Sequence, residues 1–113
     1  MKYELRWANE GVKEKWATLK RSTSKQDQDL VKSIKRTLEK LEYNPFNRGV
    51  NIPKDRIPKS LRKEYCLHNL FKIDINDNWR LVYFAKSLER DATLVIVIDF
   101  MTHIEYNRLF GYN

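Results

Sequence analysis

Cysteine, glycine and proline are all scarce in this chain of 113 residues, which contains one, three and three of them respectively. The lone cysteine, Cys66, excludes an internal disulfide, and no Cys/His spacing typical of a zinc site is present. So few glycines and prolines also exclude long low-complexity linkers. We therefore expect a fold that depends on neither a cross-link nor a metal ion or cofactor.

Long hydrophobic runs are absent as well. No segment approaches the ~18 consecutive apolar residues of a membrane-spanning helix. Residues 1–11 (MKYELRWANEG) also lack the apolar stretch of a signal peptide. Hydrophobic residues nevertheless make up 42% of the chain and aromatic residues 12%, which suffices for one modest core. The expectation is a single cytoplasmic domain over residues 1–113, without membrane association.

Positive charge exceeds negative charge, giving a formal net charge of +7 and a pI of about 9.6. Residues 1–73 contain 18 Lys and Arg against 9 Asp and Glu, whereas residues 74–113 contain 4 against 6. A positive field concentrated in the first two-thirds of the chain predicts attraction to a polyanion, most commonly nucleic acid. The alternative is a basic surface that serves only solubility.

Two amphipathic helices are predicted in the first half of the chain, after a short strand over residues 2–7. Residues 9–21 (NEGVKEKWATLKR) repeat apolar side chains at spacings of four and three, which places them on one stripe of a helix. Ser24 and Asp27 resemble a capping box at the start of a second helix. That helix should end near Asn44, because a residue before proline avoids helical dihedrals.

The segment after these helices, residues 45–69, is expected to be the least regular part of the chain, with one short helical turn over residues 59–65 (KSLRKEY). It is strongly basic. The cations of this segment that we expect to contact RNA are Arg48, Lys54, Arg56, Lys59, Arg62 and Lys63. A basic, ordered segment beside a sheet suits contact with a phosphate backbone, and the alternative is a solvated loop.

Three strands are predicted in the remainder: residues 70–76 (LFKIDIN), 79–86 (WRLVYFAK) and 93–100 (TLVIVIDF). Short polar connections separate them, which indicates a meander of antiparallel strands. The expected fold is therefore α+β, with an N-terminal helical hairpin packed on one face of a small, mainly meander antiparallel sheet.

Arg80 interrupts an otherwise apolar strand. Its guanidinium must reach water, a carboxylate or a phosphate, because burying it unpaired costs several kcal/mol. If residues 76–78 form the loop, Asp74 lies opposite Arg80 and Lys72 lies beside them, whereas a two-residue loop would reverse that relation. The simplest outcome is a cross-strand ion pair between Asp74 and Arg80.

His103 follows the last strand, and Tyr106, Arg108 and Tyr112 come close behind it. Imidazole titrates near neutral pH and can move a proton in RNA cleavage. The aromatic rings and the cation suit stacking on an unpaired base and holding phosphate. His68, in the loop before a strand, is a weaker candidate.

Residues 70–84 (LFKIDINDNWRLVYF) and 98–112 (IDFMTHIEYNRLFGY) resemble, in this order, segments of toxins of the RelE/ParE superfamily, which belong to type II toxin–antitoxin systems. The resemblance includes the order of elements and covers most of the chain. It implies a compact sheet with an N-terminal helical hairpin. For the RelE branch it implies metal-independent cleavage of mRNA, often on the ribosome, by attack of the ribose 2′-OH on the adjacent phosphate. It also implies a cognate antitoxin as partner.

Position by position, the resemblance implies roles for four residues. Arg80 would clamp phosphate, and Lys72 would stabilise charge or act as a base. His103 would be a general acid or base, and Tyr106 would stack on the substrate or position it. The basic segment 48–63 and the lysines of the second helix would contact the backbone of messenger or ribosomal RNA.

Asp74 departs from this pattern, because RelE itself carries a second lysine there. A carboxylate at this position repels phosphate and could quench Arg80, unless it replaces the lysine as a base. Two alternatives therefore stand beside RNA cleavage. One is a non-catalytic, ParE-like toxin that poisons a protein target such as DNA gyrase, and the other is a degenerate relative that only binds RNA.

Overall fold

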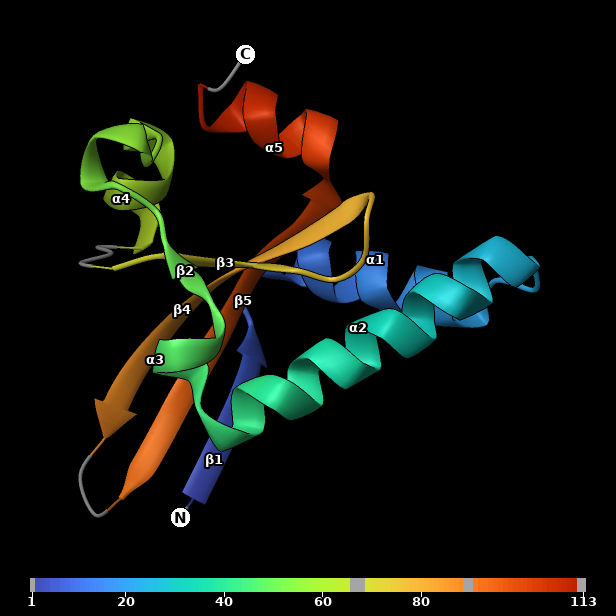
Figure 1. The fold of residues 1–113 in the computed structure, drawn as a ribbon, viewed down its shortest axis with the longest axis horizontal. Helices are drawn as coiled ribbons and strands as arrows, with labels where there is room; N and C mark the ends of the chain where they lie inside the picture. Colours follow the sequence, from blue (N-terminus) through green and yellow to red (C-terminus); the bar gives the residue numbers. More distant parts are fainter. Residues whose placement is uncertain (1, 66–68, 89–90, 112–113) are drawn as a thin grey trace.

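A computed structural model describes residues 2–65, 69–88 and 91–111 of the chain (Figure 1). In chain order its elements are β1 (Lys2–Trp7), α1 (Glu10–Arg21), α2 (Lys25–Tyr43), α3 (Pro45–Arg48), β2 (Val50–Asn51), a 3-10 turn (Lys54–Arg56), α4 (Lys59–Tyr65), β3 (Phe71–Asp74), β4 (Trp79–Leu88), β5 (Ala92–Thr102) and α5 (His103–Leu109). This is the α+β class expected from the sequence. No helix within these ranges has the length and hydrophobicity needed to cross a membrane.

The strands form one sheet in the order β1-β5-β4-β3-β2. β3, β4 and β5 are successive antiparallel neighbours, as predicted. β1 confirms the strand expected over residues 2–7, but it runs parallel to β5, so the sheet is mixed and not antiparallel throughout. A hairpin makes neighbouring strands antiparallel, whereas β1 is separated from β5 by most of the chain and packing sets its direction.

Alternate side chains of the strands enter two different cores. On what we call the hairpin face, α1 and α2 cover the sheet (Figure 1). Its buried side chains are Val12, Trp16, Leu30, Ile34, Leu41, Phe71, Leu81, Tyr83, Ala85, Val95, Val97 and Phe100. On the opposite face, which we call the tail face, α5 and the segment 52–57 pack on the sheet. Its buried side chains are Ile52, Ile57, Leu70, Val82, Ile98, Met101, Tyr106 and Phe110.

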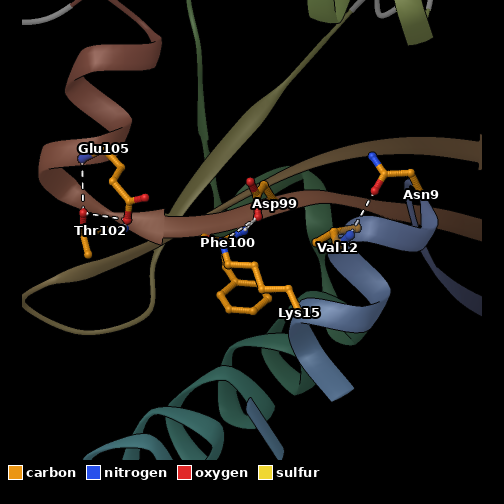
Figure 2. A network of polar contacts seen from close by, with 7 residues as sticks. All are labelled: Asn9, Val12, Lys15, Asp99, Phe100, Thr102 and Glu105. Atoms are coloured by element: carbon orange, nitrogen blue, oxygen red, sulfur yellow. Dashed lines mark hydrogen bonds and ion pairs between the residues drawn. The ribbon is translucent and has the colours of Figure 1, made fainter. Parts of the chain in front are cut away.

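The predicted ends of the two long helices are confirmed. Ser24 is the N-cap of α2, where its Oγ accepts a hydrogen bond from the Asp27 N–H at 3.1 Å, and the helix ends at Tyr43 with Asn44 as its C-cap. Of the expected capping box the structure shows the Ser24 half, while the Asp27 carboxylate accepts from the Ser22 hydroxyl at 2.6 Å. α1 begins after Asn9, whose Oδ1 accepts from the Val12 N–H at 2.9 Å (Figure 2). Each cap satisfies a main-chain donor at the helix start, which typically stabilises the fold by about 1 kcal/mol.

Residues 45–69 are more regular than expected. The helix predicted over residues 59–65 is present as α4, but α3 and β2 were not anticipated. A buried side chain from β4 holds this segment: the Tyr83 hydroxyl donates to the Pro45 carbonyl at 2.5 Å. Burial also raises the pKa of Tyr83 to about 12. A hydrogen bond between distant segments leaves little signal in the sequence. Local patterns therefore could not predict the regular structure of this segment.

The helix α5 follows β5 directly and was not predicted. Its start is a capping box, in which the Glu105 N–H donates to Thr102 Oγ1 at 3.2 Å and the Thr102 N–H donates to Glu105 Oε1 at 3.0 Å (Figure 2). The hydrogen bonds that the main-chain N–H and the hydroxyl of Thr102 donate to the carboxylate hold the pKa of Glu105 below its usual value. The sequence T-H-I-E carries the signal for this box. Nearby, the Lys15 ammonium of α1 lies 3.0 Å from Asp99 Oδ1 and fixes α1 to β5 (Figure 2).

Candidate functional site

The β3–β4 hairpin has the register that brings the expected site residues together. Its loop is Asn76–Asn78, since the Ile75 N–H donates to the Trp79 carbonyl at 2.9 Å. Asp74 therefore lies opposite Arg80, and Lys72 opposite Val82. Because paired residues project to the same side of a sheet, Lys72, Asp74 and Arg80 all lie on the tail face. The relation that the sequence left open is thereby decided in favour of the three-residue loop.

Arg80 finds both a carboxylate and an aromatic ring. Its Nε donates to Asp74 Oδ1 at 2.8 Å, so the cross-strand ion pair expected from the sequence is present. The guanidinium carbon lies 4.6 Å from the centre of the Tyr106 ring. The Arg80 side chain is 16% exposed and that of Asp74 63% exposed. Water therefore reaches the carboxylate more freely than the guanidinium, and the carboxylate can move away at modest cost.

Lys72 lies beside Arg80 over the same ring, with its Nζ 5.1 Å from the centre of Tyr106. Partial burial lowers the pKa of Lys72, the positive charge of Arg80 lowers it further, and the negative charge of Asp74 opposes both effects. A lowered pKa increases the fraction of neutral amine near neutral pH. Lys72 is thus suited both to neutralising a phosphate and to accepting a proton.

His103 joins this group through Asp74. It is the first residue of α5, and its main-chain N–H donates to the Asn78 carbonyl at 2.9 Å, which ties the helix to the β3–β4 loop. Its Nε2 is buried, has no hydrogen-bond partner among the described residues, and lies 3.5 Å from Asp74 Oδ1. The imidazole and the carboxylate are therefore close enough to exchange a proton after a small movement.

Tyr106 is buried beneath the other side chains of the cluster and is not one of its exposed members. The side chain is 1% exposed and packs on Phe110, with ring centres 4.5 Å apart. Stacking on an unpaired base, one of the two roles implied for Tyr106, does not fit this burial. Instead, the ring face supports the cations of Lys72 and Arg80, a cation–π arrangement worth about 0.5–2 kcal/mol per contact.

A hollow of about 540 Å³ opens beside this cluster. We call it the cationic hollow, and its lining residues are Lys40, Arg48, Val50, Lys72, Ile73, Asp74 and Arg80. Lys40 comes from α2 and Arg48 from the end of α3, so segments far apart in the sequence contribute to it. Four cations against one carboxylate favour a bound anion. His103 does not line the hollow, but its Nε2 lies 3.5 Å from the carboxylate of Asp74, which does.

The other residues expected to contact RNA lie elsewhere. Lys54, Arg56, Lys59, Arg62, Lys63 and Arg108 are exposed and do not line the cationic hollow. Arg56 donates from Nη1 to the Gly111 carbonyl at 2.6 Å, which links the basic segment to the turn that follows α5. Tyr112 and His68 lie outside the described residues.

The lowered pKa of Lys72 leads to a prediction about its chemical reactivity. An amine-acylating reagent should modify Lys72 at lower pH in the folded chain than in the chain unfolded in urea, as measured by mass spectrometry of peptides over a pH series. Arg80→Gln should raise the pH midpoint of Lys72 modification, because it removes a positive charge that disfavours the protonated amine. Asp74→Asn should move it further downward, because it removes an attracting one. Identical pH midpoints for Lys72 in the folded and the unfolded chain would contradict this interpretation of the cluster.

The arrangement combines two cations over an aromatic ring with an imidazole and a carboxylate within reach of one another. Such a set can hold a phosphodiester and move a proton at it. Among the described residues, no group of three or more His, Cys, Asp or Glu side chains gathers in a way that could hold a metal ion. Comparison of the chain with models of known protein families, with curated proteins and with solved structures found no match.

Proposed function

We propose that this protein is a RelE-like toxin of a type II toxin–antitoxin system, which cleaves mRNA without a metal ion by attack of the ribose 2′-OH on the adjacent phosphate. The observation that supports it is the grouping of Lys72, Arg80 and the Asp74–His103 pair around Tyr106, beside a cationic hollow. The α+β architecture and the positive net charge are consistent with it.

Each requirement of this reaction has a candidate side chain in the cluster. Arg80 and Lys72 neutralise the charge that develops on the phosphorane. Lys72, through its lowered pKa, or the Asp74 carboxylate takes the proton of the 2′-OH. His103 donates a proton to the leaving 5′-oxygen once Asp74 has turned away from it. Tyr106 touches no substrate and positions the two cations.

The partners follow from charge and from the resemblance. Arg48 and Lys40 in the cationic hollow contact the RNA backbone next to the cleaved phosphate. The exposed cations of segment 54–63 contact a more distant part of the messenger or of ribosomal RNA. A cognate antitoxin covers this surface with acidic residues, since complementary charge directs such an association.

The Asp74–Arg80 ion pair favours a second candidate. Arg80 is already paired with a carboxylate at 2.8 Å, which weakens its attraction for a phosphate and so favours a ParE-like function that does not need RNA cleavage. Such a protein acts on a protein target such as DNA gyrase. Induced expression separates the two functions, because RNA cleavage arrests translation and leaves cut transcripts, whereas gyrase poisoning causes DNA damage.

RNA cleavage is tested directly with the purified chain and a labelled single-stranded RNA, supplied both free and as messenger on translating ribosomes. We expect cut RNA with 2′,3′-cyclic phosphate ends in the presence of EDTA. A DNA strand of the same sequence should stay intact because it lacks the nucleophile. Uncut RNA in both settings, or equal cleavage of the DNA strand, would reject the proposed function.

A further inference from the structure

The outer edge of β1 has main-chain groups available for another strand. β1 is the first strand in the sheet order, and its paired neighbour is β5. The Ala8 N–H donates to the Val97 carbonyl, so the even-numbered residues of this strand point their main-chain groups at β5. Main-chain direction alternates along a strand, and the N–H and C=O groups of Tyr3, Leu5 and Trp7 therefore point outward.

The side chains of β1 form a self-complementary pattern around Leu5. Glu4 and Arg6 lie on either side of it and pair with each other within the strand, with the Arg6 Nε 2.8 Å from Glu4 Oε1. Both are well exposed, with side-chain exposures of 47% and 65% respectively. If a second copy of β1 lies antiparallel with Leu5 opposite Leu5, each Glu4 faces the partner's Arg6.

The direction of the main-chain N–H and C=O groups agrees with this register. Leu5 has outward N–H and C=O groups, so it can exchange both hydrogen bonds with the partner's Leu5. Tyr3 and Trp7, which also point outward, fall opposite one another across the two copies. The charged pairs then occupy the non-hydrogen-bonded positions, where side chains approach most closely.

Space for an added strand exists along the same edge. A hollow of about 470 Å³ is lined by the second half of β1 and the start of α1, from Leu5 to Glu10 and by Lys13. The lining residues on β1 are those that a neighbouring strand would contact. The edge lies on the far side of the sheet from β3, which carries Lys72 and Asp74, so its occupation leaves the cationic hollow open.

We propose that two copies of this chain associate through antiparallel pairing of their β1 strands about Leu5, forming one continuous sheet with two-fold symmetry. Charge complementarity selects a second copy as the occupant, since the Glu4/Arg6 pattern matches itself in this register. The association is a concentration-dependent dimer, because a short strand edge buries less area than a permanent interface. This inference does not depend on the proposed function.

Sedimentation velocity over a concentration series tests the dimer with charge reversals. Glu4→Arg places two like-charged arginines opposite each other, and Arg6→Glu does the same with carboxylates. Each variant alone should weaken dimerisation at least about tenfold. An equimolar mixture of the two variants should restore it, because the strand with two arginines then faces the strand with two glutamates.

Matched controls come from Glu14 and Arg21 of α1, which form a similarly exposed ion pair at 3.1 Å. Glu14→Arg and Arg21→Glu change the net charge equally and should leave dimerisation unchanged. A chain that stays monomeric at the highest concentration would overturn the proposal. So would a dimer insensitive to reversal at position 4 or 6, which would indicate another surface, and a mixture that fails to reassociate, which would exclude this register.

Discussion

Replacing Arg80 with alanine is expected to lower the rate of RNA cleavage at least about a hundredfold, the usual effect of removing a group that stabilises transition-state charge. The guanidinium lies over the Tyr106 ring and beside Lys72, where a phosphate entering the cationic hollow would meet it. The loss should appear mainly in kcat, because charge on the phosphorane develops only in the transition state.

The fold should survive this substitution. Arg80 contributes a cation–π contact and a partly exposed ion pair, so its loss should cost only about 1–2 kcal/mol. Circular dichroism and thermal unfolding check that the variant is folded. Lys86→Ala, which removes an exposed cation from the same strand, is the matched control and should cleave like the wild type. An Arg80→Ala variant that keeps more than a third of the rate would exclude this residue from the chemistry.

Gly49→Ala is expected to destabilise the fold by about 1–3 kcal/mol, the range typical of overpacking. A Cβ at Gly49 would lie 2.9 Å from the ring carbon Cζ of Tyr83, closer still to its hydroxyl, and 3.0 Å from the Lys72 carbonyl. Tyr83 is fully buried and held by its hydrogen bond to Pro45, so neither the ring nor the β3 backbone can give way cheaply. Denaturant unfolding measures the change in free energy.

The same substitution should weaken RNA binding. Gly49 stands directly between Arg48, which lines the cationic hollow, and Val50, which pairs with Lys72. Displacing the segment therefore moves a wall of the hollow. Gly11→Ala is the control, because the new Cβ would meet only the Asn9 side chain at 3.1 Å, near the start of α1. It should change the free energy of unfolding by less than about 1 kcal/mol, because alanine favours helix while the Asn9 cap must shift slightly. Equal effects of the two substitutions would show that the contact with Tyr83 is not the cause.

The sequence by itself determined the helices and strands that form through interactions between residues close together in the chain. Apolar spacing located α1 and α2, and Ser24 and Asn44 marked the ends of α2. Strand periodicity located β3, β4 and β5, but it left two registers open for the β3–β4 hairpin, and the structure has the one in which Asp74 faces Arg80. In each case the residues that form the helix or strand lie within a few positions of one another, so a local sequence pattern is enough to predict it.

Only the tertiary structure decided the direction of β1, the ordering of residues 45–50 and the surroundings of Tyr106. A parallel pairing with β5, a hydrogen bond from Tyr83 to Pro45 and the burial of an aromatic ring beneath two cations all join segments that are distant in the chain. The free energy of such contacts depends on how whole faces pack. No local sequence pattern reports this free energy. Tyr106, which the sequence suggested could stack on a base of the substrate, is therefore instead buried beneath two cations in the fold.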